Sequence, residues 1–208
     1  MKRILIVDNH EVVRAGVIKI VDDTSIVFGE ASTASQAMRM IRDQPWDLVV
    51  LDISLGDQSG QDVLKELKQI RPTLPVLVLT MHAEAQYAKR AFRAGAGGFI
   101  TKDSPREELA VAIRHVLEGR KYVSETIAGE LMADRDKGVE QPLHHSLSDR
   151  EFQVMCLMAS GKTVGEIAVL LELSDKTIST YRARILEKMG MKTNAEIIRY
   201  AIRNHLGG

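Results

Sequence analysis

Several features are scarce in this chain of 208 residues, and each scarcity excludes a class of protein. Cysteine occurs once, at Cys156, so no disulfide can form within the chain, as is typical of proteins of the reducing cytoplasm. No apolar run has the roughly 20 residues that a membrane-spanning helix needs, and the first residues lack the apolar core of a secretory signal. We therefore expect a cytoplasmic protein without a membrane partner.

An excess of charge and a set of zinc ligands are also lacking. Lys and Arg number 28, and so do Asp and Glu, so the net charge alone does not indicate a nucleic-acid or membrane partner. The six His residues and the single Cys do not show the spacing of zinc ligands. With 45% hydrophobic residues, the composition is that of a globular protein whose length suits one large domain or two small ones.

Residues 1–120 alternate between short apolar runs and segments with helical periodicity. The expected strands are Arg3–Val7, Ile26–Ala31, Leu48–Leu51, Val76–Leu79 and Gly98–Ile100. The expected helices are Val12–Val21, Ser35–Asp43, Gln61–Ile70, Glu84–Ala94 and Pro105–Glu118, the last preceded by an N-cap signal at Asp103-Ser104-Pro105. The pattern predicts an α/β, doubly wound, flavodoxin-like domain with a five-stranded parallel sheet.

Residues 147–208 show helical patterns only, and we expect a small all-α domain of four helices there. The helices are expected at Asp149–Ala159, Val164–Leu171, Asp175–Met189 and Ala195–Asn204. Ser148 and Ser174 have the positions of N-caps, and Gly161 and Gly190 those of helix ends.

Residues 121–146 are expected to be a linker with a short helix at Thr126–Ala133, because residues 134–142 are polar and interrupted by Gly and Pro. The charge also divides near this linker. Residues 147–208 carry nine Lys and Arg against seven Asp and Glu, a net charge of +2, whereas residues 1–146 carry 19 against 21, a net charge of −2. The division is mild and equally consistent with statistical scatter.

Four polar residues follow expected strands, at the edge where the carboxyl ends of parallel strands meet. They are Asp8, Asp52, Thr80 and Lys102. Carboxylates with a carbonyl can hold Mg²⁺, a carboxylate can attack phosphorus, and a hydroxyl and an ammonium can stabilise phosphoryl oxygens. Each residue alone is more often a cap or a surface residue, but together they predict a phosphoryl-acceptor site. Asp52 is the better nucleophile candidate because its strand is central.

At these residues the chain resembles a known family. The segments Ile4–Asp8, Leu48–Asp52, Leu79-Thr80 and Gly98–Lys102 resemble the receiver domain of two-component response regulators. The segments Leu147–Glu151, Gly161–Ala168 and Ser174–Ile185 resemble a LuxR-type helix-turn-helix domain. Nearly the whole chain is therefore similar to the NarL/FixJ class of response regulators.

The resemblance implies a response regulator transcription factor. Asp52 would accept a phosphoryl group from a sensor histidine kinase, which would promote dimerisation or release of the helix-turn-helix domain for sequence-specific binding to double-stranded DNA. Mg²⁺ would be held by Asp8, Asn9, Asp52 and the main-chain carbonyl of Ser54. The phosphoryl group would be contacted by Thr80 and Lys102, and Phe99 would reposition with Thr80. RNA polymerase and a second copy of the chain are the other expected partners.

Two residues limit this interpretation. The family usually has an acidic residue where this chain has Asn9, and an uncharged amide should bind Mg²⁺ more weakly. The sequence does not distinguish a switching Phe99 from one that only packs in the core.

The second half also has the spacing of a helix-turn-helix, with a turn at 172–174 between two helices. We expect Ile178, Ile185 and Met189 to face inward. The side chains expected to bind DNA are Lys176, Thr177, Ser179, Thr180, Arg182 and Arg184. A solvated basic helix face is the simpler alternative.

Two other functions stay open. Asn9 is also consistent with a degenerate receiver on a DNA-binding regulator that acts independently of phosphorylation. A small phosphohydrolase with an aspartyl nucleophile is the other alternative, although haloacid-dehalogenase-like enzymes have a second Asp where this chain has Ser54. Apart from slow autodephosphorylation, we do not expect an enzyme.

Overall fold

The computed structural model describes residues 1–21, 24–55, 59–81, 85–125, 127–129, 142–204 and 206. The chain forms two compact units, Met1–Ala133 and Asp134–Gly208. Most of the expected linker helix at 126–133, the linker residues 130–141 and the loop 56–58 lie outside the described residues.

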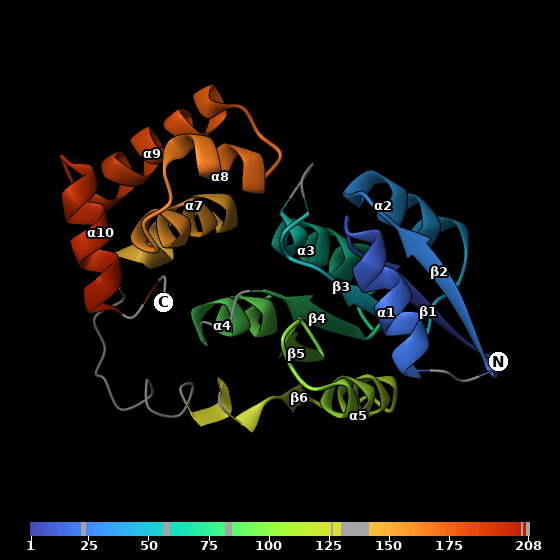
Figure 1. Ribbon diagram of the computed structural model, residues 1–208. Coiled ribbons are helices and arrows are strands. Elements are labelled where there is room, and N and C mark those ends of the chain that lie inside the picture. Colours follow the sequence, from blue (N-terminus) through green and yellow to red (C-terminus); the bar gives the residue numbers. More distant parts are fainter. Residues whose placement is uncertain are drawn as a thin grey trace. The chain divides into compact units, whose positions relative to one another are not determined.

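The N-terminal unit contains a parallel β-sheet in the order β2-β1-β3-β4-β5-β6 (Figure 1). Its strands are β1 (Lys2–Val7), β2 (Ile26–Ala31), β3 (Leu48–Leu51), β4 (Val76–Thr80), β5 (Gly98–Thr101) and β6 (Tyr122–Val123). β3 and β4 are buried along their whole length, as their continuous apolar runs predict. The order of the first five strands is that of flavodoxin-like sheets, so the predicted fold class is confirmed.

Helices cover both faces of this sheet. They are α1 (Glu11–Val21), α2 (Ala34–Asp43), α3 (Gly60–Ile70), α4 (Ala85–Arg93) and α5 (Arg106–Leu117). α1 and α5 pack together on one face, where Val17 and Ile113 join a core with Ile4, Val50 and Leu77. α2, α3 and α4 form a row on the other face. The apolar residues of the sheet are thus covered on both sides.

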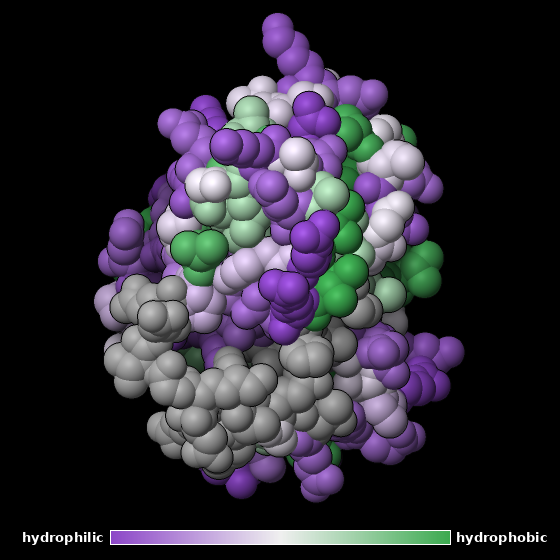
Figure 2. All heavy atoms as spheres, turned by 90° about the vertical axis from the view of Figure 1, so that its left-hand side faces the viewer, coloured by the Kyte–Doolittle hydropathy of each residue, from purple (hydrophilic) through white to green (hydrophobic). Residues whose placement is uncertain are grey.

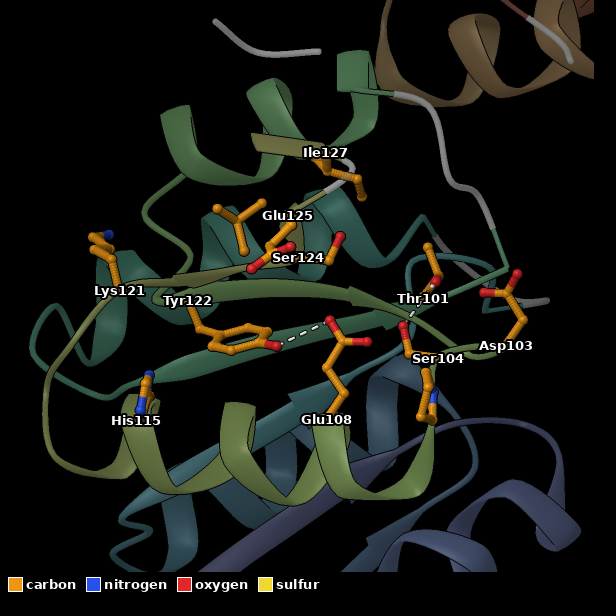
Figure 3. Close-up of a pocket in the computed structure, with 12 residues that line it drawn as sticks. Thr101, Asp103, Ser104, Glu108, His115, Lys121, Tyr122, Ser124, Glu125 and Ile127 are labelled. Carbon is orange, nitrogen blue, oxygen red and sulfur yellow. Dashed lines mark hydrogen bonds between the residues drawn. The ribbon is translucent and has the colours of Figure 1, made fainter. Parts of the chain in front are cut away.

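The sheet has one strand more than the five predicted. Gly119, with φ +75, ends the turn after α5, and the chain then runs parallel to β5 as β6. The Tyr122 hydroxyl donates a hydrogen bond to Glu108 Oε1 on α5 at 3.0 Å, across a groove of about 850 Å³ (Figure 3). A strand of two residues is too short to show any periodicity in the sequence, which is why it was not predicted.

The predicted N-cap before α5 was wrong. Pro105 holds the N-cap position, and no side chain caps the helix there. Ser104 Oγ instead forms a hydrogen bond of 3.1 Å with Thr101 Oγ1, within the loop that follows β5. The Ser-Pro signal predicted the start of the helix but not the partner of the hydroxyl.

The C-terminal unit is helical. Its elements are η1 (Leu143–Ser146), α7 (Asp149–Ala159), α8 (Val164–Leu170), α9 (Asp175–Met189) and α10 (Asn194–Arg203). Ser148 and Ser174 cap α7 and α9 as predicted, and Gly190 ends α9 in the left-handed conformation with φ +64. The four predicted helices are therefore confirmed. On α10, Ile197 and Ala201 are buried, whereas Ile202 is 61% exposed.

On the face drawn in Figure 2, hydrophilic side chains surround separate hydrophobic patches. Among the described residues, no helix is both long and apolar enough to cross a membrane.

Candidate functional site

The carboxyl ends of four parallel strands bring together the four polar residues that were predicted to form the phosphoryl-acceptor site. Asp8 follows β1, Asp52 follows β3, Thr80 ends β4 and Lys102 follows β5. The main-chain N–H of Lys102 donates to the Thr80 carbonyl at 2.7 Å, which places these two residues side by side. Asp8, Asp52 and Thr80 are each at most 2% exposed, so the site is built from buried polar groups.

Lys102 connects the two carboxylates. Its Nζ lies 2.6 Å from Asp8 Oδ2 and 2.8 Å from Asp52 Oδ2, and its side chain is only 8% exposed. Two carboxylates and one ammonium leave one negative charge in a buried place. This arrangement is suited to a further cation or to the electropositive phosphorus of a phosphoryl group.

The main chain fixes the orientation of Asp52. The Ser54 N–H donates to Asp52 Oδ1 at 2.9 Å, and the Asp52 N–H donates to the Val7 carbonyl at 2.9 Å. Gly60, at the start of α3, packs against this turn so closely that a Cβ there would lie 2.1 Å from the Asp52 carbonyl oxygen. Only glycine allows the backbone of α3 to approach the acceptor loop in this way.

Burial and charge act in opposite directions on the titration of this cluster. Burial raises the pKa of Asp52, and although the Lys102 ammonium opposes this effect, the pKa stays above its usual value. Burial works to lower the pKa of Lys102, but Asp52 and Asp8 raise it above its usual value, so Lys102 remains protonated. An ionised Asp52 is therefore held in a place that does not favour its charge, as in many reactive sites.

His10 is a member of the cluster that the sequence predictions missed. Its main-chain N–H donates to Asp8 Oδ1 at 2.8 Å, and its Nδ1 lies 3.1 Å from the same oxygen. One potential ligand atom each from Asp8, His10 and Asp52 lie within 4.8 Å of one another. The only signal in the sequence was its position two residues after Asp8, next to Asn9.

These donors fit a divalent cation. Carboxylate oxygens are the preferred ligands of hard divalent ions, and Asp8 and Asp52 supply them from adjacent strands. Asn9, which stands between Asp8 and His10 in the chain, has an amide side chain without charge.

Thr80 and Phe99 share one face of the sheet. Thr80 pairs with Thr101, and Phe99 pairs with Val78, so these four side chains point to the same side of the two strands. Phe99 is fully buried, and so is Thr80. A movement of the Thr80 side chain would therefore alter the packing on the face of the sheet where Phe99 lies.

The helix predicted to bind DNA is α9. Ile178, Ile185 and Met189 are buried, as predicted. Of the six predicted DNA-binding residues, three are exposed and three are half-buried; the exposed ones are Lys176, Thr180 and Arg184, and the half-buried ones are Thr177, Ser179 and Arg182.

Two of the α9 hydroxyl groups already have local partners. Thr177 Oγ1 lies 2.8 Å from Ser174 Oγ, and Thr180 Oγ1 donates to the Lys176 carbonyl at 2.9 Å. The cationic side chains are therefore the stronger candidates for contacts outside the helix.

Comparisons with known families and proteins give matches for both units. Residues 4–114 match the family described as "Response regulator receiver domain", and residues 145–201 match "Bacterial regulatory proteins, luxR family". The response regulator UvrY of Escherichia coli K12 is 33% identical over 210 residues, covering 99% of this chain and 96% of that protein. The response regulator GacA of Pseudomonas aeruginosa is 33% identical over 211 residues, covering 98% and 97%.

Solved structures give similar results. A LuxR-family two-component response regulator from Aurantimonas is 35% identical, with a TM-score of 0.60, covering 64% of this chain and 96% of that one. The response regulator ChrA of a heme-sensing two-component system is 29% identical, with a TM-score of 0.51, covering 98% of each chain.

Proposed function

This chain belongs to the two-component response regulators that join a receiver domain to a LuxR-type DNA-binding domain, and we propose that Asp52 is its phosphoryl acceptor. The family predicted from the sequence is thereby confirmed, and with it the function of a response regulator transcription factor. The observation that supports the proposal for Asp52 is its buried carboxylate, bonded to Ser54 N–H and to Lys102 at the carboxyl end of β3.

The proposed reaction is transfer from a phosphorylated histidine of a sensor kinase. A carboxylate oxygen of Asp52 attacks phosphorus, the P–N bond breaks, and the departing imidazole keeps the electron pair and takes up a proton. The Lys102 ammonium would bind the phosphoryl oxygens as negative charge develops on them, and the Ser54 N–H would hold the carboxylate in place. Slow hydrolysis of the acyl phosphate would return the site to its starting state.

We infer that Mg²⁺, the ion implied by the family, would be held by Asp8 and Asp52, with the Ser54 carbonyl and the Asn9 amide as further ligands. When bound, the ion would neutralise charge on the phosphoryl oxygens. Because Asn9 is uncharged, we expect weaker Mg²⁺ binding than at a site with a third carboxylate. A Mg²⁺ titration of phosphorylation in wild type and Asn9→Asp measures this difference.

The output proposed is DNA binding by α9. A phosphoryl group adds about two negative charges beside Lys102 and Thr80, which favours a new packing of Thr80 and Phe99. Dimerisation of the phosphorylated chain would then raise the affinity for paired DNA half-sites through effective concentration. At a promoter, RNA polymerase would be the next partner.

The acceptor is tested by labelling with acetyl phosphate, followed by phosphate-affinity electrophoresis. Asp52→Asn should abolish the shifted band. Asp103→Asn, which removes an exposed carboxylate one residue after Lys102, should leave it unchanged. A band of wild-type intensity in Asp52→Asn would show that another residue accepts the phosphoryl group.

The DNA surface is tested by the affinity of the phosphorylated chain for promoter DNA. Arg184→Ala should weaken binding and reduce its dependence on salt, because a phosphate or base contact is lost. Arg120→Ala, an exposed arginine of the receiver unit paired with Glu118, is the matched control. Equal affinity of both variants and wild type would exclude Arg184 from the interface.

A second candidate function is DNA binding independent of phosphorylation, which Asn9 favours. It is separated from the first by measuring DNA affinity of wild type and Asp52→Asn with and without beryllofluoride, a mimic of the phosphoryl group. A gain in wild type alone supports the phosphorylation switch. Equal affinity under all four conditions supports the second candidate. Neither family match favours the phosphohydrolase considered earlier.

A further inference from the structure

His10 occupies an unusual position beside the acceptor site. It precedes α1 and directly follows Asn9, and its side chain is 63% exposed although its ring nitrogen reaches the buried Asp8 carboxylate. The main-chain N–H of His10 donates to the same oxygen, Asp8 Oδ1, at 2.8 Å. The backbone thus fixes the start of the side chain, while the exposed ring has room to adjust.

The distances suit two neighbouring ligands of one ion. Donors at right angles on an octahedral ion with bonds of about 2.1 Å lie about 3.0 Å apart. His10 Nδ1 and Asp8 Oδ1 are separated by 3.1 Å. A ligand atom of Asp52 completes a set in which all separations are within 4.8 Å.

The chemistry of this set differs from one made of carboxylates only. With Asn9 uncharged, the side chains supply two carboxylates, whose charge is partly balanced by Lys102. Imidazole nitrogen is a poor ligand for Mg²⁺ but a good one for first-row transition metals, whose affinity for nitrogen sites is generally higher.

We propose that His10 is a ligand of the divalent ion at the acceptor site, and that it makes the site prefer a transition-metal ion such as Mn²⁺ to Mg²⁺. The inference deepens the proposed function, since it concerns the ion that would assist phosphorylation of Asp52. In this proposal, His10 replaces the acidic metal ligand that the family usually has at the position of Asn9.

The test uses the full chain and Mn²⁺ as the probe, with no phosphodonor present. Pulsed electron paramagnetic resonance of Mn²⁺ bound to wild type should show a coupling to a histidine nitrogen. This coupling should change from that of ¹⁴N to that of ¹⁵N when the protein is labelled with ¹⁵N-histidine. The affinity for Mn²⁺, obtained from the electron paramagnetic resonance signal of the unbound ion, should be at least about tenfold lower for His10→Ala than for wild type. Competition with Mg²⁺ should show a much smaller change in Mg²⁺ affinity.

Two variants serve as controls. His115→Ala removes a histidine of α5 that contacts Tyr122, and it should keep the Mn²⁺ affinity and the nitrogen coupling of wild type. Asn9→Asp should raise the affinity for Mg²⁺ and reduce the preference for Mn²⁺. Because the His10 ring is largely exposed, His10→Ala is expected to fold normally.

The possible failures are distinguishable. Absence of Mn²⁺ binding, a spectrum without a histidine nitrogen, or unchanged Mn²⁺ affinity in His10→Ala would overturn the role of His10. Labelling of Asp52 is measured separately, in saturating Mg²⁺ and in Mn²⁺, and Asp52 counts as unlabelled only if neither ion supports labelling. Labelled Asp52 without nitrogen coupling refutes only the role of His10, whereas nitrogen coupling with unlabelled Asp52 supports that role and refutes the proposed acceptor.

Discussion

In the C-terminal unit, α7, α8, α9 and α10 each begin at a Ser or Thr side chain that accepts a backbone N–H three residues later; these residues are Ser148, Thr163, Ser174 and Thr193. Among the receiver-unit helices whose caps the structure describes, α2 has such a cap at Thr33, while α3 and α5 begin at Ser59 and Pro105 without one. The small unit depends on local capping, whereas the receiver helices are held by a sheet buried on both faces.

The two units also differ in where their charges lie. The receiver unit buries Asp8, Asp52 and Lys102 together at one edge of its sheet. In the C-terminal unit, the buried Glu151 pairs with Lys188, whose side chain is 40% exposed, and supports a helix cap. Buried charge thus serves the proposed reaction in one unit and stability in the other. Substitutions in each unit test this difference.

Gly60→Ala should cause the largest loss of stability. The new Cβ would lie 2.1 Å from the Asp52 carbonyl oxygen and 2.5 Å from Ile53 Cα, so α3 must move, at a cost of about 3 kcal/mol. Trp46, the single Trp of the chain, reports receiver unfolding in urea by fluorescence. Gly16→Ala, with nothing within 4 Å of the new Cβ, is the control and should instead stabilise α1 by about 0.5–1 kcal/mol. Equal effects of the two substitutions would contradict the close approach.

Glu151→Ala should destabilise the C-terminal unit by about 2 kcal/mol, because Glu151 Oε2 accepts from Ser148 N–H at 2.7 Å and from Lys188 at 2.6 Å. The measurement is urea unfolding followed by circular dichroism. Glu166→Ala removes the matching cap of α8 at an exposed side chain and should cost less. A larger loss for Glu166→Ala would show that burial is not what makes Glu151 important.

The same Glu151 contact should depend on pH. Burial works to raise the pKa of Glu151, but Lys188 and Ser148 together lower it below its usual value of 4.5. Its contribution is therefore full above pH 4.5 and disappears as the pH falls through the lower pKa of the folded state.

Asp52→Asn should stabilise the receiver unit by about 1 kcal/mol at pH 7, because an ionised Asp52 is disfavoured by burial in the folded state. Asp47→Asn is a control of opposite sign. The Arg3 N–H and Lys2 lower the pKa of Asp47, so its charge favours the folded state and its removal should destabilise. Thermal unfolding followed by Trp46 fluorescence compares the two. A loss of stability in Asp52→Asn would indicate that the ion pair with Lys102 outweighs the cost of burial.

Tyr122→Phe should have the smallest effect, a loss of about 0.5–1 kcal/mol from the hydrogen bond to Glu108. Burial and Glu108 raise the pKa of Tyr122 to about 12 from 10.0. The stabilisation is therefore complete below pH 10 and is lost as the pH rises toward 12. Unfolding measured at pH 8 and pH 11 should show a smaller difference between wild type and Tyr122→Phe at the higher pH.

Much of this arrangement was predictable because its signals are local. The apolar runs of β3 and β4, the caps at Ser148 and Ser174 and the left-handed Gly190 all follow from neighbouring residues. The predictions were wrong or incomplete where contacts between residues distant in the chain determine the local structure. Ser104 bonds to Thr101 instead of capping α5, and β6 forms only because β5 offers it an edge.

The sequence alone determined the order of strands and helices, since period and capping are properties of adjacent residues. It also determined which polar residues end the strands. The tertiary structure decided that Lys102 reaches both carboxylates, that Gly60 touches the acceptor turn and that His10 belongs to the same cluster. Distances between side chains far apart in the chain depend on how the strands pair and the helices pack, and no local pattern records them.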